Sequence, residues 1–200
     1  MMEKNLTIEY VYGKPWTCVK DGEYTYHFMY GSLFSSRFGD TNNYSKSEVR
    51  EKLVNSVFAK QLEEFYGDRL VPVMLDLTSL NGSKEYGVLS GDRIAIPTLD
   101  ILRKFKENIP LMNGWYWTST PNGTKQTGDT SYVRIVNVGG NMDYNDCNWN
   151  SNSVRPFCTG RRNRVSKTLK LESRYQKNKQ PFLYRKVQDK YKGMKYYDRR

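Results

Sequence analysis

The charges of this chain change abruptly near residue 160, and this change limits what the chain can fold into. The 200 residues include 32 Lys and Arg and 21 Asp and Glu, for a net charge of +11. Residues 161–200 hold 15 of these cations and 3 of the carboxylates, which leaves 17 cations and 18 carboxylates in residues 1–160. The sequence therefore predicts a nearly neutral domain over 1–160 followed by a basic tail over 161–200.

The neutral part has the composition of a folded domain. Aromatic residues make up 14% of the chain, including 16 Tyr and 4 Trp, which is enough to build a core. No apolar stretch approaches the roughly 18–20 residues that cross a bilayer, and residues 1–9 lack the apolar centre of a secretory signal. We expect a cytoplasmic protein with reduced thiols and no membrane contact, although a pairing of Cys147 with Cys158 stays open.

The motifs of common enzymes are missing from the sequence. It contains neither a P-loop nor a G-x-G-x-x-G stretch, and none of its 3 Cys forms a C-x-x-C pair. His27 is the only histidine, and it lies in the alternating aromatic stretch Tyr24–Tyr30, where an ordinary strand histidine is expected. The sequence therefore predicts a protein without enzymatic activity, cofactor or metal.

Strand and helix patterns follow one another in an α+β order. Alternating residues predict strands over 6–12 and 22–30, and Ser45 with Glu48 forms a capping box for one helix that ends near Gly67. A short apolar run follows Pro72, and residues 92–96 resemble a strand. Thr98 caps a second helix that ends before Pro110. Strands are then expected over 115–120 and 132–136, and residues 154–158 close the domain.

Several short motifs occur in the order typical of one family. Trp117-Thr118-Ser119-Thr120, Gly139-Gly140 and Val154-Arg155-Pro156 form its closing signature, and Asn43-Tyr44-Ser45, Arg50, Leu75-Asp76-Leu77 and Ser90-Gly91-Asp92-Arg93-Ile94 match its earlier part. Residues 20–160 thus resemble a bacterial or phage C-type-lectin-like domain of uncharacterised function, similar to the Fibrobacter-type major paralogous domain. The resemblance implies two helices and a small, mostly antiparallel sheet, together with binding rather than catalysis.

The resemblance also implies a variable, ligand-facing segment rich in Asn and aromatic residues, which falls on 137–152. Its candidate ligand face comprises Asn141, Tyr144, Asn145, Asn148, Trp149 and Asn150. Asp143 and Asp146 are its only carboxylates, too few for a typical calcium site. Two interpretations of the asparagines remain open. They vary for recognition, as in targets of diversity-generating retroelements, or they simply form turns.

The basic tail interleaves cations with aromatic side chains, a composition that suits phosphate contacts and base stacking. Pro181 and Gly193 also delimit a short amphipathic helix over 181–192. Contact with nucleic acid, docking on an acidic protein or nucleoprotein, and a solvated tail remain as alternatives. The residues that would bind a partner are Arg161, Arg162, Arg164, Lys167, Lys170, Arg174, Tyr175, Lys177, Lys179, Arg185, Lys186, Lys190, Tyr191, Lys192 and Lys195.

These features together predict an interaction protein of a phage or another mobile element. Its lectin-like domain is expected to bind a macromolecular partner, and its tail to contact nucleic acid or a nucleoprotein assembly. Such a protein could inhibit a host defence in the host cytoplasm or form a minor, virion-associated component. The alternative is a receptor- or glycan-recognition module that uses residues 137–152.

Overall fold

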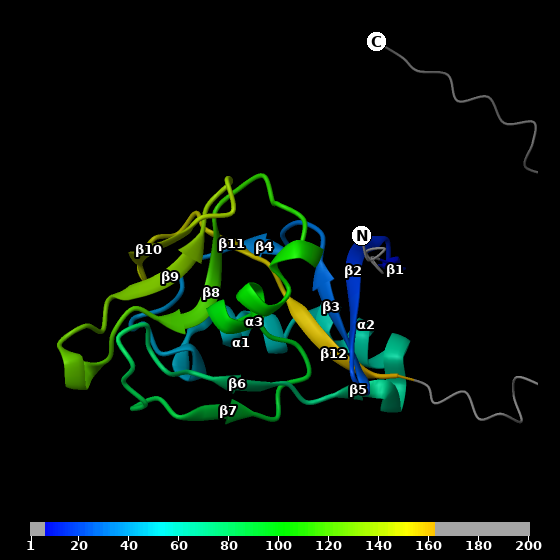
Figure 1. Cartoon of the computed structure of the whole chain (residues 1–200), viewed down its shortest axis with the longest axis horizontal. Coiled ribbons are helices and arrows are strands. Elements are labelled where there is room, and N and C mark those ends of the chain that lie inside the picture. Colours follow the sequence, from blue (N-terminus) through cyan, green and yellow to red (C-terminus); the bar gives the residue numbers. More distant parts are fainter. Residues whose placement is uncertain (1–6, 163–200) are drawn as a thin grey trace, which may run out of the picture. The chain divides into compact units, whose positions relative to one another are not determined.

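Two five-stranded sheets form the frame of residues 7–162, the part of the chain that the computed structural model describes (Figure 1). The first sheet is antiparallel throughout and has the order β1-β2-β3-β12-β5. Its strands are β1 (Thr7–Val11), β2 (Lys14–Asp21), β3 (Tyr24–Met29), β5 (Leu70–Val71) and β12 (Phe157–Arg161).

The second sheet has the order β10-β9-β8-β11-β4, with a parallel pairing only between β11 and β8. Its strands are β4 (Phe34–Ser35), β8 (Tyr116–Pro121), β9 (Tyr132–Val136), β10 (Met142–Asp146) and β11 (Ser153–Val154). A separate hairpin pairs β6 (Met74–Asp76) with β7 (Val88–Ser90). The class is α+β, as predicted, but the strands form three sheets where one small sheet was expected.

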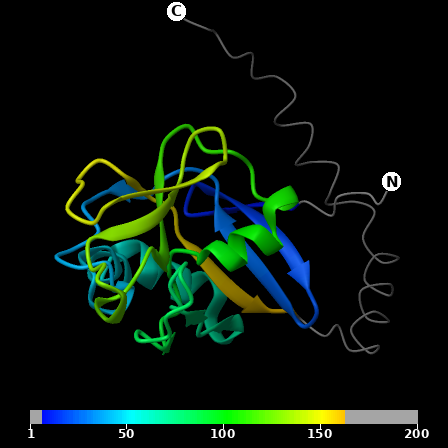
Figure 2. The same cartoon turned by 60° about the vertical axis from the view of Figure 1, so that its left-hand side comes forward.

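Three α-helices pack on these sheets within residues 7–162, whereas the sequence predicts two in the domain. They are α1 (Glu48–Val54), α2 (Val57–Tyr66) and α3 (Leu99–Lys104). Short 3-10 helices supplement them at η1 (Tyr44–Lys46), η2 (Gly67–Arg69), η3 (Lys106–Asn108) and η4 (Lys125–Thr127). Figure 2 shows the first sheet beside α3, seen from a second direction. No helix among the described residues is long and apolar enough to cross a membrane.

Two serines explain why the expected single helix is two. Ser47, not Ser45, begins α1, and its hydroxyl accepts the N–H of Arg50 at 3.1 Å. Ser56 interrupts the predicted helix with an extended backbone (φ −67°, ψ 151°) and begins α2 by accepting the N–H of Ala59 at 3.0 Å. An N-cap residue has a non-helical backbone conformation. The serine that caps α2 therefore cannot continue α1, and the predicted helix is divided there.

Two other strand predictions need correction. The chain between the expected strands 6–12 and 22–30 is itself a strand, β2, which pairs with both neighbours through two-residue turns. Tyr12 and Gly13 make the first turn, with φ values of 46° and 74°, as two-residue hairpin loops require. Residues 92–96 form no strand, since only Ala95 pairs, by an isolated bridge to Phe157.

The hydrophobic core lies between the elements in two clusters. The larger joins both sheets to α1 and α2, with Trp16 stacked on Phe58 at 5.8 Å and Trp117 edge-on to Phe38 at 5.4 Å. The smaller lies under α3, on the other face of the second sheet, and consists of Leu99, Leu102, Met112, Tyr116 and Val136. The second sheet is therefore covered fully on one face and only partly on the other.

The last strand crosses the boundary that the charge pattern indicates. The chain divides into Met1–Arg162 and Asn163–Arg200. Arg161 ends β12 opposite Tyr24, and the Arg162 N–H donates to the Glu23 carbonyl at 2.9 Å. Both arginines, expected in the tail, thus belong to the first unit. The other tail residues and the predicted helix over 181–192 lie outside the described residues.

Candidate functional site

The outer face of the second sheet carries the candidate binding surface. Residues that pair directly across neighbouring strands point to the same side of a sheet. Tyr144 pairs with Arg134 and Asp146 pairs with Tyr132, so these four share one face. Val133 and Ile135 alternate with them and are fully buried in the larger core cluster. The face that carries these four residues is therefore the one opposite the larger core cluster, and it is the outer face of the second sheet.

Two aromatic side chains are exposed on this face, and a third is exposed in the loop after β10. Tyr132 is 42% exposed, Tyr144 is 53% exposed and Trp149, in the loop after β10, is 54% exposed. The rings of Tyr132 and Tyr144 meet edge to face at 5.3 Å, and the guanidinium of Arg134 lies 5.9 Å from the centroid of Tyr144. Aromatic side chains with a neighbouring Arg are the composition that protein-binding surfaces favour. We call Tyr132, Arg134, Tyr144 and Trp149 the aromatic face.

Arg134 is held in place by few hydrogen bonds. Its Nη1 donates to Asn122 Oδ1 at 3.3 Å, and its buried Nε has no hydrogen-bond partner within residues 7–162. Burial lowers its pKa, partly opposed by the carboxylate of Asp143. A buried donor without a partner costs about 1–3 kcal/mol.

A groove of about 460 Å³ continues the aromatic face toward α3. Its floor is the outer face of the same sheet, because Met142 pairs with Val136 and Val136 pairs with Tyr116. Its walls come from α3, from the segment after it and from the turn between β9 and β10. The lining residues are Leu102, Lys106, Glu107, Ile109, Pro110, Leu111, Tyr116, Val136, Gly139, Gly140, Asn141 and Met142.

Two signature motifs build the walls of this groove. Arg155 is only 2% exposed, and it donates from Nε to the Met29 carbonyl at 2.8 Å and from Nη1 to the Pro110 carbonyl at 3.0 Å. It thereby ties the wall at Pro110 to β3. In the turn between β9 and β10, Gly140 has a φ of +78°, which favours glycine, and a Cβ there would lie 2.6 Å from Leu111 Cδ2 and displace that flexible side chain.

The remaining signature residues support the fold rather than bind. Trp117, Thr118 and Ser119 are fully buried. The Trp117 indole donates to the Ser36 carbonyl at 2.8 Å, and the Thr118 hydroxyl donates to the Arg134 carbonyl at 2.8 Å. Arg50 and Asp92, from two earlier motifs, form a two-bond ion pair at 2.7 and 2.9 Å. The residues that carry the family resemblance thus hold the sheets together.

The six residues of the predicted ligand face do not share one surface. Tyr144 belongs to the aromatic face with Trp149, and Asn148 and Asn150 are exposed beside Trp149. Asn141 is exposed and lines the groove. Asn145 is half-buried and pairs with the core residue Val133, so it points to the opposite side of β10 from Tyr144. Its inclusion in the ligand face was wrong, because strand alternation separates neighbouring residues.

Some asparagines of this segment have the turn-forming role left open above. Asn137 Oδ1 accepts the N–H groups of Gly139 and Asn141 at 3.0 and 3.1 Å. Asn145 Oδ1 accepts the N–H of Asp146 at 2.9 Å. The side chains of Asn137 and Asn145 thus accept hydrogen bonds from neighbouring backbone N–H groups, whereas Asn141, Asn148 and Asn150 are exposed.

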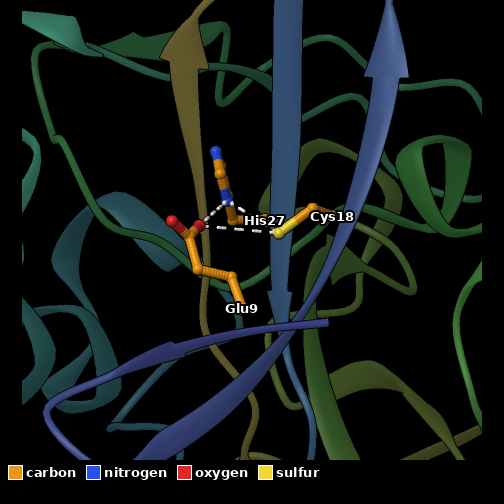
Figure 3. A group of neighbouring side chains, drawn as sticks. All are labelled: Glu9, Cys18 and His27. Atoms are coloured by element: carbon orange, nitrogen blue, oxygen red, sulfur yellow. Dashed lines mark hydrogen bonds and ion pairs between the residues drawn. The ribbon is translucent and has the colours of Figure 1, made fainter. Parts of the chain in front are cut away.

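A second group of polar side chains lies on the first sheet, on the face that packs against α2. Glu9 from β1, Cys18 from β2 and His27 from β3 point toward one another (Figure 3). Cys18 Sγ lies 3.2 Å from His27 Nδ1, Glu9 Oε2 lies 3.3 Å from the same nitrogen, and Cys18 Sγ lies 3.7 Å from Glu9 Oε2. Cys18 and His27 are each 6% exposed. We call these three residues the Glu–Cys–His cluster.

The α2 helix completes the surroundings of the cluster. The Tyr66 hydroxyl donates to Glu9 Oε2 at 2.7 Å and lies 3.1 Å from His27 Nδ1. Burial lowers the pKa of His27 to about 4 and, helped by Glu9, raises the pKa of Cys18 to about 12. At neutral pH the imidazole is therefore uncharged and the thiol protonated. A thiolate–imidazolium pair for nucleophilic catalysis would need the opposite states.

The sequence prediction placed His27 correctly on a strand and overlooked the cluster around it. The sequence nevertheless contains a signal for the cluster. Two-residue turns at Tyr12-Gly13 and Gly22-Glu23 fix the register of both hairpins, and that register sets Cys18 opposite His27. Comparison of the chain with family models, curated proteins and solved structures gives no match.

Proposed function

We propose that this chain is a non-enzymatic binding protein with a C-type-lectin-like domain and two separate binding surfaces. The aromatic face and the adjoining groove bind a protein partner, and the basic tail contacts nucleic acid or a nucleoprotein. The observation that carries the proposal is the exposure of Tyr132 and Tyr144 on one face of the second sheet, with Trp149 exposed in the loop after β10. Exposed aromatic side chains gathered beside an apolar groove are costly in water and typical of interaction sites.

The shape of this surface favours a macromolecule over a small metabolite. The groove is open and is lined by apolar residues together with Lys106, Glu107 and Asn141. A mixture of apolar and polar groups is usual in a protein interface. The aromatic side chains would act as anchors, and Arg134 would donate to the partner.

The second proposed surface, the basic tail, is supported by the composition of its sequence. Residues 163–200 hold 13 Lys and Arg against 3 Asp and Glu, an excess of positive charge that attracts phosphates. The aromatic residues between the cations would stack on bases or pack on the partner. In this proposal the tail holds the protein near nucleic acid while the folded unit binds its protein partner.

The aromatic face is tested by alanine substitution with two measurements on each variant. Tyr144→Ala and Trp149→Ala should weaken capture of the partner by at least about thirtyfold, a loss of roughly 2 kcal/mol typical of interface anchors. The same variants should change the free energy of unfolding by less than about 0.5 kcal/mol, as exposed positions do. Val57→Ala, at a residue that is 73% exposed on α2, is the matched control. Equal capture by all variants would contradict the proposal.

The tail is tested by the salt dependence of binding to single-stranded RNA. For the full chain, log affinity should fall with log salt at about 0.7 per phosphate contact. Replacing four tail cations with glutamine (Arg185, Lys186, Lys190 and Lys192) should reduce that slope by up to about 2.8. The control replaces four exposed lysines of the first unit, namely Lys14, Lys60, Lys84 and Lys125. A slope that falls equally in both variants would show no special role for the tail.

Glycan recognition is the second candidate function, and the loop after β10 favours it. Asn148 and Asn150 are exposed on either side of the exposed Trp149, which places amide groups next to an aromatic ring. Binding of a defined glycan that is lost in Trp149→Ala and kept in Tyr132→Ala would favour this function over a protein partner.

A further inference from the structure

The Glu–Cys–His cluster has the donor atoms and spacing of a metal site. We propose that Glu9 Oε2, Cys18 Sγ and His27 Nδ1 bind a single Zn²⁺ ion on the α2-facing side of the first sheet. This site is separate from the aromatic face, since it lies on a different sheet. A bound ion would join β1 to β2 and β3.

The three interatomic distances match the edges of a zinc tetrahedron. Zinc binds sulfur at about 2.3 Å, nitrogen at about 2.0–2.1 Å and carboxylate oxygen at about 2.0–2.2 Å. Tetrahedral angles then place sulfur about 3.5 Å from nitrogen, sulfur about 3.5 Å from oxygen, and nitrogen about 3.3 Å from oxygen. The observed separations are 3.2, 3.7 and 3.3 Å. Small side-chain rotations would therefore complete the geometry.

Hydrogen bonding alone does not account for this arrangement well. A ring nitrogen has either one lone pair or one N–H, so it makes one good hydrogen bond. Three polar atoms lie within 3.3 Å of His27 Nδ1, namely Cys18 Sγ, Tyr66 Oη and Glu9 Oε2. A cation among these donors would use the nitrogen, the sulfur and the carboxylate oxygen at once.

The donor set selects zinc over harder cations. Calcium and magnesium prefer oxygen ligands only, whereas sulfur with imidazole nitrogen and one carboxylate suits zinc. Glu9 keeps 34% of its side chain exposed, which gives the ion a path from solvent and leaves a fourth position for water. The Tyr66 hydroxyl, at 2.7 Å from Glu9 Oε2, is the outer hydrogen-bond donor that orients a ligating carboxylate.

The surroundings of the imidazole keep it in place for this role. A Cβ on Gly160 would lie 3.3 Å from His27 Nε2 and 3.8 Å from the Arg69 carbonyl. A larger residue at position 160 in β12 would therefore crowd the imidazole ring. Cys158 pairs with His27 on the other side and is fully buried, and it offers a further sulfur on the same sheet face.

The test is Zn²⁺ titration of the purified full-length, reduced protein by calorimetry, with Co²⁺ absorption as a spectroscopic reporter. Wild type should bind one ion and show thiolate-to-cobalt charge transfer. Cys18→Ser and Glu9→Gln should each weaken Zn²⁺ binding at least about 100-fold, and Tyr66→Phe should weaken it about 10–100-fold, as the loss of an outer hydrogen bond does. Cys147→Ser and Glu64→Gln, which change a cysteine and a carboxylate outside the cluster, should bind as wild type does.

Two outcomes would overturn the proposal. One is the absence of Zn²⁺ binding and of the cobalt charge-transfer band in wild type. The other is wild-type affinity in both Cys18→Ser and Glu9→Gln. Because Glu9 is partly exposed on an edge strand, Glu9→Gln keeps the test valid even where Cys18→Ser disturbs folding. Partner capture and RNA binding do not enter this experiment, so its result is independent of the proposed function.

Discussion

Two neighbouring asparagines, Asn42 and Asn43, should respond oppositely to the same substitution. Asn42 is fully buried, and its Nδ2 donates to the carbonyls of Gly123, Asp129 and Tyr132 at 3.1, 3.2 and 3.1 Å. Asn43 instead accepts through Oδ1 from the N–H and the hydroxyl of Ser45 at 3.0 and 2.7 Å. Aspartate preserves an acceptor and removes a donor. We therefore expect Asn42→Asp to destabilise the protein and Asn43→Asp to leave it nearly unchanged.

The magnitude follows from the hydrogen bonds that Asn42 makes. Its two N–H groups serve three carbonyls, and its Oδ1 accepts from the Tyr86 hydroxyl at 2.8 Å. We count one hydrogen bond for each of the two N–H groups and one for Oδ1. At about 1 kcal/mol each, Asn42→Ala should lower the free energy of unfolding by about 3 kcal/mol. For a protein of this size that is a fall in melting temperature of roughly 6–12 °C. At pH 7, Asn42→Asp should cost more, because a buried carboxylate would face the carbonyls.

The pH dependence of Asn42→Asp has a definite sign. Burial among carbonyls raises the pKa of the new carboxyl above its unfolded value of about 3.9. A raised folded pKa means that the penalty is full at high pH and shrinks as the pH falls through the folded pKa. Urea unfolding followed by tryptophan fluorescence, compared with wild type at each pH from about 4 to 8, measures this. Equal, small effects of Asn42→Asp and Asn43→Asp at every pH would refute the reasoning.

Three further experiments test the packing around the groove and the motifs. Arg155→Lys should lower the free energy of unfolding in urea by about 2–4 kcal/mol, because lysine cannot keep two buried hydrogen bonds to separate carbonyls. A loss below about 1 kcal/mol would show that the two guanidinium hydrogen bonds are unimportant. A double-mutant cycle of Arg50→Ala with Asp92→Ala should give a coupling energy of about 1–3 kcal/mol, and strict additivity would contradict the ion pair. Gly140→Val should lower the melting temperature, and Leu111→Ala should relieve only the steric part, since the positive φ remains unfavourable. Complete rescue would mean that the backbone conformation carries no strain.

Local signals in the sequence predicted much of the fold. The aromatic alternation over Tyr24–Tyr30 gives β3, and the β-branched stretch at 132–136 gives β9. Thr98 begins α3, where its hydroxyl accepts the Ile101 N–H at 3.2 Å. In each case the residues that decide the element lie within a few positions of one another. Propensity and capping act at that range, so these elements can be predicted without knowledge of the rest of the chain.

The elements that sequence reasoning missed depend on contacts between distant residues. Lys14–Asp21 has a proline near its start and buries four consecutive residues, so it does not alternate like a half-exposed strand. It becomes β2 because a strand pairs with it on either side. The Glu–Cys–His cluster likewise needs three strands in register. Asn145 was misplaced because composition alone does not show the side of β10 to which each residue points.

The most direct test of the two-surface account is site-specific photocrosslinking from the aromatic face in cells that contain the partner. A benzoyl-phenylalanine at position 144 or 149 of the full chain should give one discrete protein adduct, because these side chains are exposed on that face. The same crosslinker at position 57, which is also exposed, should give none. The four-glutamine tail variant should keep the adduct at 144, since the tail binds separately. No discrete adduct at 144 or 149, or the same adduct at 57, would contradict the account.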